Sequence, residues 1–424
     1  MNTQKVPEAV NKLRSECLRA IDLINQSQLE LFKYGDLYSP ETLRARIDSV
    51  FKQPDSQLST QLEAVRTLLR DVLDQYGDPF ANYIDPVRHS SYKRRRQGSL
   101  VGIGLKFRAH AEALPLVIGV LLGGPLEGAD IRPGDRISSV DGIDLQGASS
   151  RQVSDALSGE VGTSVTLSIL AGSTRQRRQL SIRRQAVELH YARAEILDNS
   201  MARLKISRFG GNTHNRVQQL IVSLRQDGVN ALVLDLRDNP GGSTRAARFI
   251  MSMFDDSEWV FCEQYKNGKS NRLPRAGKKL TNMPLAILVN ENSMSSSEIL
   301  AGALQSSGRA TVIGAPTYGK GLIQKVFPLA QPLGGAVRCT IATWATLDEI
   351  PLHGRGLIPD IYVPSAPRHL FRETGSLNIS AESRTYRREL LEQGFHDSLP
   401  AQEAEVLIAL PDRQLQRAIS HLAV

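Results

Sequence analysis

The sequence predicts a multidomain α/β protein with a helical N-terminal arm, a β-rich domain, a layered α/β core and a helical C-terminal extension. The 424 residues exceed one ordinary domain, which commonly holds roughly 100–200 residues. Apolar residues follow helical spacing first, then short runs between glycine and proline turns, then alternating strand and helix patterns. Hydrophobic residues make up 41% of the chain and charged residues 23%, which excludes fibrous and wholly disordered proteins. We expect domain boundaries that give residues 1–96, 97–186, 187–365 and 366–424.

The first part, residues 1–96, shows helical periodicity. Its apolar residues recur three or four positions apart in three successive stretches, and Pro40 suits the first turn of a helix. The basic run at residues 93–96 has little aromatic interleaving, so we interpret it as a solvated linker and not as a nucleic-acid contact. We therefore expect about three helices and no nucleic-acid partner.

The second part, residues 97–186, has the pattern of a small β-rich domain. Short apolar runs alternate with glycine and proline turns. Ser149 or Ser150 can cap a helix that runs to Leu157, and a second short helix is expected after Pro125, at residues 126–130. Strands are expected at residues 101–107, 116–121, 136–140, 164–170 and 178–183.

The third part, residues 187–365, alternates strands and helices. This order predicts a mostly parallel, layered sheet, in which ligands bind at the turns that lead from strand to helix. The last part, residues 366–424, is polar with helical apolar spacing. In the third part, strands are expected at residues 231–236, 284–289, 310–313 and 322–327, and helices at 217–225, 243–253 and 295–305.

Charge, cysteine and histidine content narrow the function classes. Lysine and arginine number 52 against 44 acidic residues, and we read the net charge of +8 as serving solubility. The three cysteines lie far apart and no H-E-x-x-H motif occurs, so we expect no metal site and no cofactor. No stretch approaches the ~20 apolar residues of a membrane span. Charged residues interrupt the first thirty positions, so no signal-peptide core is expected.

A Gly-Gly turn follows the first apolar strand of the core. The strand ends at Leu236, and the turn that holds Gly241 and Gly242 exposes backbone N–H groups before a helix begins. Such a turn can bind an anion. It can equally be an ordinary loop whose glycines adopt positive φ, and the residues alone leave both interpretations open.

A serine-rich turn, residues 290–298, follows the next strand of the core. Ser295 and Glu298 fit a capping box at the start of a helix. A serine in this place lies near the positive end of the helix dipole, which favours an alkoxide or an oxyanion. Spacing alone does not choose among the four serines of the turn, Ser293, Ser295, Ser296 and Ser297.

A serine nucleophile needs a base, and Lys320 is a candidate. It stands between two glycines before an apolar strand, and Gln324, four residues on, shares its face. An exposed lysine titrates near ~10.4 and is a poor base at neutral pH, but burial can lower its pKa by several units. Composition alone favours an exposed turn residue at Lys320, because lysine side chains are mostly exposed.

These segments together resemble the carboxyl-terminal processing (tail-specific) proteases, serine peptidases with a Ser–Lys active site and a PDZ domain. The resemblance implies that Ser295 is the nucleophile, Lys320 the general base and Gln324 the residue that steadies the lysine. It also implies an oxyanion hole from the N–H of Gly241 or Gly242 and that of Ser296. The matching motifs are Leu-Asp-Leu-Arg-x-Asn-Pro-Gly-Gly at 234–242, Ser-x-Ser-x-Ser-Glu at 293–298, Thr-Tyr-Gly-Lys-Gly-x-x-Gln at 317–324, Gly-Arg-Gly-Leu-Ile-Pro-Asp at 354–360, and upstream Tyr76, Gly77, Asp78, Pro79 and Tyr83.

PDZ-like signatures lie in the β-rich part, at 101–104, 132–135 and 141–142. The resemblance implies that a substrate peptide adds as a strand to this domain, with its terminal carboxylate held by Val101, Gly102, Ile103 and Gly104. The expected partners are proteins or peptides bound by their C-termini, with an adaptor protein and a homodimer as further expectations. Relatives imply a periplasmic or otherwise extracytoplasmic location.

The chain departs from the family pattern at two places, and two alternative functions stay open. Met294 and Ser296 stand where alanines are commoner, and the final helix motif, which starts at Asp412, follows an extra stretch at about 366–410. One alternative keeps Ser295 with a histidine base such as His353. The other is a catalytically silent PDZ scaffold.

Overall fold

The computed structural model of the chain forms two compact units. The larger unit combines Met1–Ser90 with Tyr191–Val424, and the smaller unit is Ser91–His190. The expected C-terminal extension lies outside the described residues except for its last helix. The structure describes residues 5–27, 40–52, 57–110, 112–121, 124–172, 174, 176–197, 200–348, 350–364 and 412–423.

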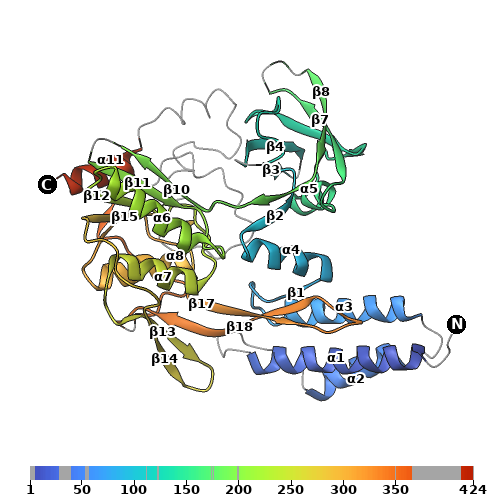
Figure 1. Cartoon of the computed structure of the whole chain (residues 1–424). Helices are drawn as coiled ribbons and strands as arrows, with labels where there is room; N and C mark the ends of the chain where they lie inside the picture. The colour runs from blue at the N-terminus through green and yellow to red at the C-terminus, as the bar shows by residue number, and fades with distance from the viewer. Residues whose placement is uncertain are drawn as a thin grey trace. The chain divides into compact units, whose positions relative to one another are not determined.

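Three helices form the N-terminal arm of the larger unit, as the periodicity predicts: α1 (Lys5–Ser27), α2 (Pro40–Phe51) and α3 (Leu58–Gln75). Their apolar stripes share one core with the hairpin formed by β17 and β18, and the hairpin lies along α1 and α3 (Figure 1). The fully or almost fully buried members from the helices include Leu13, Cys17, Leu43, Ile47, Leu69 and Leu73.

An antiparallel sheet joins this arm to the core. Its strand order is β1-β18-β13-β14, with β17 also paired to β18. The sequence predicted β17 within the parallel set and did not predict β1, β13, β14 and β18, because neighbouring strands of an antiparallel sheet need no helix between them. The strands are β1 (Asn82–Ile84), β13 (Trp259–Tyr265), β14 (Ser270–Pro274), β17 (Leu322–Pro328) and β18 (Ala336–Ala345).

A mostly parallel sheet forms the centre of the larger unit and confirms the layered α/β prediction. Only β10 pairs in the antiparallel sense, with β11. The central strands are buried on both faces, which explains their continuous apolar sequences. In spatial order the strands are β10 (Ala192–Ile196), β11 (Met201–Ile206), β12 (Ala231–Asp235), β15 (Leu285–Val289), β16 (Thr311–Gly314) and β19 (Ile361–Tyr362).

Helices cover both faces of this sheet. Leu285, Ile287 and Val289 of β15 point into the core formed with α6, α7 and α8, whereas Ala286 and Leu288 point to the face covered by α11. Strand alternation therefore divides one apolar run between two helix layers. The helices are α6 (Thr213–Gln226), α7 (Thr244–Phe254), α8 (Ser296–Ser306) and α11 (Arg413–Leu422).

The smaller unit is the expected β-rich domain. Ser149 caps its helix α5 (Ser150–Leu157): the Ser149 hydroxyl accepts the Gln152 N–H, and Gln152 Oε1 accepts the Ser149 N–H. A five-strand sheet in the order β3-β4-β5-β7-β8, with β6 beside β5, surrounds its core. The strands are β2 (Ser99–Gly102), β3 (Leu105–His110), β4 (Ala113–Val120), β5 (Arg136–Val140), β6 (Ile143–Asp144), β7 (Ser164–Leu170), β8 (Arg177–Arg183) and β9 (Gln185–Glu188).

Three local predictions are wrong. The basic run 93–96 is not a linker but the last turn of α4 (Pro86–Arg96). Positively charged side chains are stabilised there by the negative end of the helix dipole. The helix expected at 126–130 is a series of turns, because five residues are too short to nucleate a helix and Gly128 adopts φ +77°. The single strand expected at 101–107 breaks between β2 and β3, where Gly104 adopts φ +75°.

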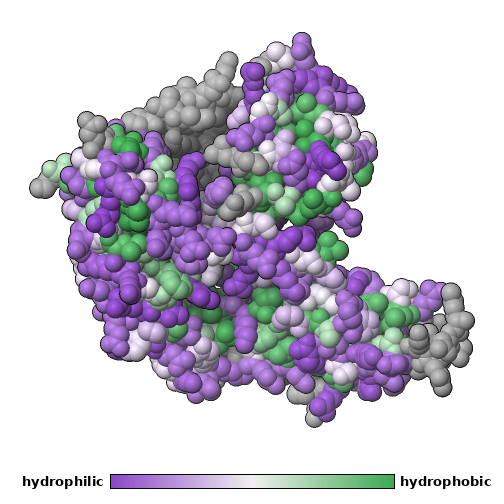
Figure 2. All heavy atoms as spheres, viewed as in Figure 1, coloured by the Kyte–Doolittle hydropathy of each residue, from purple (hydrophilic) through white to green (hydrophobic). Residues whose placement is uncertain are grey.

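The visible surface is predominantly hydrophilic. Figure 2 shows hydrophobic residues in small groups separated by hydrophilic ones on the face that it presents. Among the helices described in the structure, none is both long and apolar enough to cross a membrane.

Candidate active site

The serine turn and the Gly-Gly turn lie against each other. A Cβ atom added to Gly241 would lie 2.8 Å from Ser295 Cβ and 2.9 Å from Ser296 N, so only glycine allows this approach. Asn239 joins the two turns: its carbonyl accepts the Met294 N–H at 3.0 Å and the Ser297 hydroxyl at 2.8 Å. The two turns predicted separately from the sequence therefore form one site.

Ser295 occupies a strained position at the start of α8. Its backbone adopts φ +57° and ψ −117°, a region that residues with a side chain rarely occupy. Such backbone strain costs about 1–3 kcal/mol and is concentrated at functional sites. A sharp turn between a strand and a helix can also present a serine hydroxyl at the carboxyl end of a sheet.

The structure separates the four serines of this turn, which spacing could not do. Ser293, Ser296 and Ser297 are fully buried, and their hydroxyls donate to the carbonyls of Leu236, Gly242 and Asn239, respectively. Ser295 is only partly buried. The three buried hydroxyls hold the turn in place, and Ser295 is the partly exposed serine among the four.

Glu298 connects the serine turn to the lysine segment. Its carboxylate is fully buried, and Oε2 accepts both the Ser295 N–H, at 2.7 Å, and the Lys320 N–H, at 2.9 Å. The other oxygen, Oε1, accepts the Thr317 hydroxyl at 2.5 Å and the Gly319 N–H at 2.7 Å. Glu298 therefore does more than cap the helix as expected. One of its oxygen atoms also joins the backbones of Ser295 and Lys320.

Lys320 is partly buried, and its surroundings, here called the lysine pocket, are formed by Phe80, Glu298, Gln324 and Trp344. Its amine donates to Gln324 Oε1 at 2.9 Å and lies 4.1 Å from the centre of the Phe80 ring. Trp344 Nε1 donates to the Lys320 carbonyl at 2.9 Å, so the backbone is held on both sides. In the described part of the chain, the amine makes no hydrogen bond to the Ser295 hydroxyl. The predicted contact between Lys320 and Gln324 is present in this pocket.

The surroundings of Lys320 favour its neutral form. Burial and the positive charge of Arg338 lower the pKa of the amine to about 8, although Asp78 and Glu298 act in the opposite direction. Burial raises the pKa of Glu298, against four hydrogen bonds that lower it. An amine with this pKa is neutral in a substantial fraction of molecules just above neutral pH, which a general base requires.

Two of the three predicted oxyanion donors have free N–H groups. The Gly241 N–H donates to Asn239 Oδ1 at 2.9 Å. No acceptor among the described residues binds the N–H of Gly242 or that of Ser296. Ser296 N stands at the positive end of α8, where a negative charge is stabilised.

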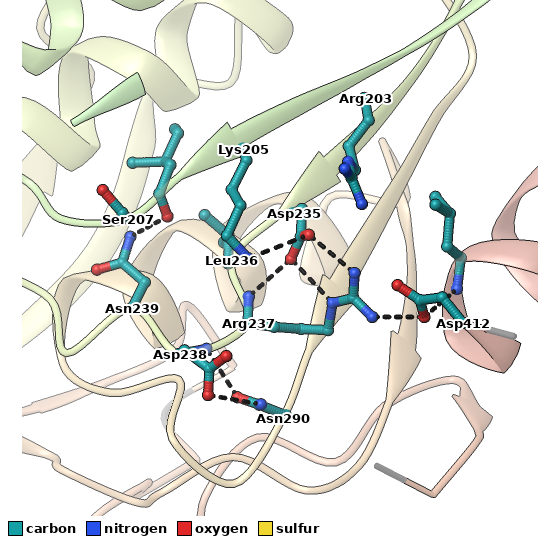
Figure 3. A network of polar contacts seen from close by, with 12 residues as sticks. Arg203, Lys205, Ser207, Asp235, Leu236, Arg237, Asp238, Asn239, Asn290 and Asp412 are labelled. Atoms are coloured by element: carbon teal, nitrogen blue, oxygen red, sulfur yellow. Dashed lines mark hydrogen bonds and ion pairs between the residues drawn. The ribbon is translucent and has the colours of Figure 1, made fainter. Parts of the chain in front are cut away.

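A buried ion-pair network lies at the end of β12, just before the Gly-Gly turn in the sequence, and Figure 3 shows it around Asp235 and Arg237. Asp235 is fully buried at the end of β12, and its two oxygens accept from Arg237 Nε at 2.9 Å and Nη2 at 2.8 Å. Arg237 Nη1 also donates to Asp412 Oδ1 at 2.7 Å and to Gln414 Oε1 at 3.3 Å, and both acceptors belong to the start of α11. The last helix is therefore attached to the loop that carries the glycines.

His353, the alternative base, is close to the lysine but not bonded to the serine. Burial lowers the pKa of its imidazole, while the backbone of Gly319 and the charge of Asp78 raise it. In the residues that the structure describes, no hydrogen bond joins the His353 ring to Ser295.

The predicted carboxylate-binding segment of the smaller unit lies beside an open strand edge. Val101 and Gly102 pair with β9, Ile103 is buried, and the Gly104 carbonyl accepts the Leu121 N–H at 2.7 Å. Strand β3 contacts α5, and among the described strands it pairs only with β4. Within the described part of the smaller unit, one edge of β3 carries no paired strand.

Three residues of the site have no role predicted from the sequence. Asn239 and Trp344 fix the two turns and the lysine backbone, and their partners lie far away in the sequence. Phe80 lies in the upstream segment that resembles the family, and the sequence predicts no role for this residue. The preceding Tyr-Gly-Asp-Pro run was the signal that could have directed attention to it.

Two family models match regions of the chain. The model of peptidase family S41 matches residues 200–363, and that of a PDZ domain matches residues 116–170. Among solved structures, the photosystem II D1 C-terminal processing protease is similar with a TM-score of 0.56 and 28% identity, over 84% of this chain and 93% of that chain.

Curated relatives carry related names. The carboxyl-terminal-processing protease of Synechocystis sp. is 32% identical over 303 residues, which cover 70% of each chain. The chloroplastic carboxyl-terminal-processing peptidase 2 of Arabidopsis thaliana is 33% identical over 319 residues, which cover 70% of this chain and 60% of the relative. The chain therefore belongs to the carboxyl-terminal-processing protease family, serine-type peptidases of family S41 with a PDZ domain.

Proposed function

We propose that this serine peptidase is an endopeptidase that cleaves by a Ser295–Lys320 mechanism and recognises its substrates by their C-terminal ends. The observation that carries the mechanism is the shared oxygen of Glu298, which accepts the N–H groups of Ser295 and Lys320 and so holds the two residues as neighbours. Gln324, bonded to the amine, is proposed to orient it.

The proposed reaction uses groups that the site holds in place. Neutral Lys320 takes the proton from the Ser295 hydroxyl as the oxygen attacks the peptide carbonyl. The N–H groups of Gly242 and Ser296 stabilise the oxyanion, each worth roughly 10²–10³ in rate, while Gly241 leaves room for the approach. Protonated Lys320 then gives its proton to the leaving amine, and water hydrolyses the acyl-enzyme.

The proposed substrate recognition rests on the PDZ domain and its open strand edge. A peptide can add to β3, with its terminal carboxylate near residues 101–104. An adaptor protein, a homodimer and an extracytoplasmic location stay predictions.

Peptide cleavage with single variants tests the mechanism. Unfolded peptides with apolar free C-termini are incubated with the wild type, Ser295→Ala, Lys320→Ala and the control Lys325→Ala, whose exposed lysine lies on β17. Mass spectrometry of the products should show cleavage by the wild type and the control alone. Retained cleavage by either site variant contradicts the mechanism, and binding without new termini by the wild type favours the silent scaffold.

The pH profile separates the two bases. With Lys320 as base, kcat/KM should rise with pH and then level off, with the midpoint of the rise near the lysine pKa of about 8, because the neutral amine is the active form. His353→Ala should leave this profile in place, whereas loss of activity in that variant points to the histidine base. Amidation of the peptide C-terminus should weaken binding, and equal cleavage of both peptides contradicts C-terminal recognition.

A further inference from the structure

The loop at residues 76–81, between α3 and β1, is fixed beside the lysine pocket. Asp78 is buried, and its Oδ1 accepts the Phe80 N–H at 2.9 Å. Its Oδ2 accepts the Thr340 hydroxyl at 2.6 Å, which ties the loop to β18. The loop therefore has one defined position next to the antiparallel sheet.

Phe80 forms a wall of the pocket. The centre of its ring lies 4.1 Å from Lys320 Nζ, on an amine that also donates to Gln324. The Phe80 carbonyl accepts from Arg338 Nε at 2.9 Å. This hydrogen bond fixes both the loop and the Arg338 guanidinium, whose positive charge acts on Lys320. The ring, its backbone and Arg338 are thus one assembly around the amine.

We propose that Phe80 and Asp78 are positioning residues for the Lys320 amine. The Phe80 ring covers the amine against water, and the negative charge of Asp78 opposes the effect of the nearby arginines on the amine. This inference rests on the proposed Ser–Lys mechanism. It gives the helical arm a part in the chemistry, because the loop that carries Phe80 directly follows α3.

The ring has two effects of opposite sign on the protonation of Lys320. Exclusion of water favours the neutral amine, whereas the face of the ring attracts the ammonium form. The charged groups that act on the amine are Arg338 of β18, Asp78 of the loop, Glu298 of α8 and Arg208 of the loop after β11. The imidazole of His353 is the further titratable neighbour, since the lysine charge acts on it.

Titration of the amine tests the proposal without any turnover. In full-length Ser295→Ala protein with ¹³C-labelled lysine, the Cε signal of Lys320, assigned with Lys320→Arg, reports its pKa. Phe80→Ala and Phe80→Leu both remove the ring face, and only the alanine variant also admits water, so this pKa should be about one unit or more higher in Phe80→Ala than in Phe80→Leu. Phe80→Leu keeps the cover but loses the ring face, and Asp78→Asn removes the negative charge, so each should lower it. Phe327→Leu, which removes the ring 5.1 Å from Lys325 Nζ, is the matched control.

Kinetics with the intact serine give the second readout. The acid limb of kcat/KM should lie at higher pH in Phe80→Ala than in Phe80→Leu, with about a tenfold loss at neutral pH for each unit and recovery at high pH. A merely structural role would lower the rate equally at all pH values.

The outcomes separate the two proposals. An equal Lys320 pKa in Phe80→Ala and Phe80→Leu, or an unchanged pKa in Asp78→Asn should the alanine variant not fold, overturns the positioning role. A shifted Lys320 pKa together with cleavage retained by Lys320→Ala supports the pocket and removes the Ser–Lys mechanism.

Discussion

Two fully buried carboxylates of the core, Asp235 and Glu298, differ in what they bind. Asp235 contacts the guanidinium of Arg237 directly, and Lys205 Nζ lies 3.3 Å from its Oδ2. Glu298 instead accepts N–H and O–H groups, including the backbone N–H of Lys320, and does not neutralise the lysine amine. The first arrangement locks two charges together. The second positions a lysine and leaves its amine able to lose a proton.

The pKa values follow this difference. Burial would raise the pKa of Asp235, but its hydrogen bonds and the charge of Arg237 lower it to about 2. Burial raises the pKa of Glu298 and lowers that of Lys320. A direct ion pair therefore suits a structural support, and a carboxylate bound by backbone groups suits a site that must exchange protons.

The largest effect is expected from Asp235→Asn, which leaves Arg237 buried with reduced compensation. Breaking a buried pair from one side costs about 3–5 kcal/mol of unfolding free energy. Chemical denaturation followed by tryptophan fluorescence measures it, since both tryptophans, Trp259 and Trp344, lie in the larger unit. The Asp235 contribution is complete above the unfolded pKa near ~3.9 and is lost as the pH falls through about 2.

The control for Asp235→Asn is the exposed pair of Glu195 with Arg203 on the neighbouring strands. Glu195→Gln should cost at most about 1 kcal/mol, because surface pairs contribute little. Equal losses in both variants would contradict the support assigned to the buried network.

A smaller effect, on catalysis, is expected from Glu298→Gln. Each carboxylate oxygen accepts two donors, so an amide nitrogen in either place faces two N–H or O–H groups. The Ser295 turn and the Lys320 segment should then separate, with a loss of about 10²-fold in kcat/KM. Steady-state kinetics measures it, against Glu263→Gln, whose carboxylate binds the Tyr265 hydroxyl on β13. Wild-type rates in Glu298→Gln would show that the shared oxygen is not needed.

The smallest effect is expected where α11 meets the network. Asp412 accepts the Leu415 N–H as the cap of α11 and pairs with Arg237. Asp412→Ala should cost about 1–2 kcal/mol, and Asp412→Asn, which keeps a capping oxygen, should cost less. Denaturation midpoints of the two variants measure the difference. Identical midpoints would assign the whole effect to the ion pair.

Local sequence patterns predicted the central strands of the core and the two strand-to-helix turns of the site. Strands β12 and β15 are recognisable because burial on both faces leaves them continuously apolar. The cap of α5 at Ser149 and the two strand-to-helix turns follow from local hydrogen-bond chemistry. The prediction of a linker at 93–96 is wrong, because charge alone does not distinguish the end of a helix from a linker.

The sequence by itself determined which residue types stand at each turn, and its family motifs indicated Ser295, Lys320 and Gln324. Only the tertiary structure decided which serine hydroxyl is accessible, which glycine N–H is free and what surrounds the lysine amine. The physical reason is distance along the chain: Phe80, Glu298 and Arg338 act on Lys320 from separate elements, and the strength of each effect depends on burial that no local pattern encodes.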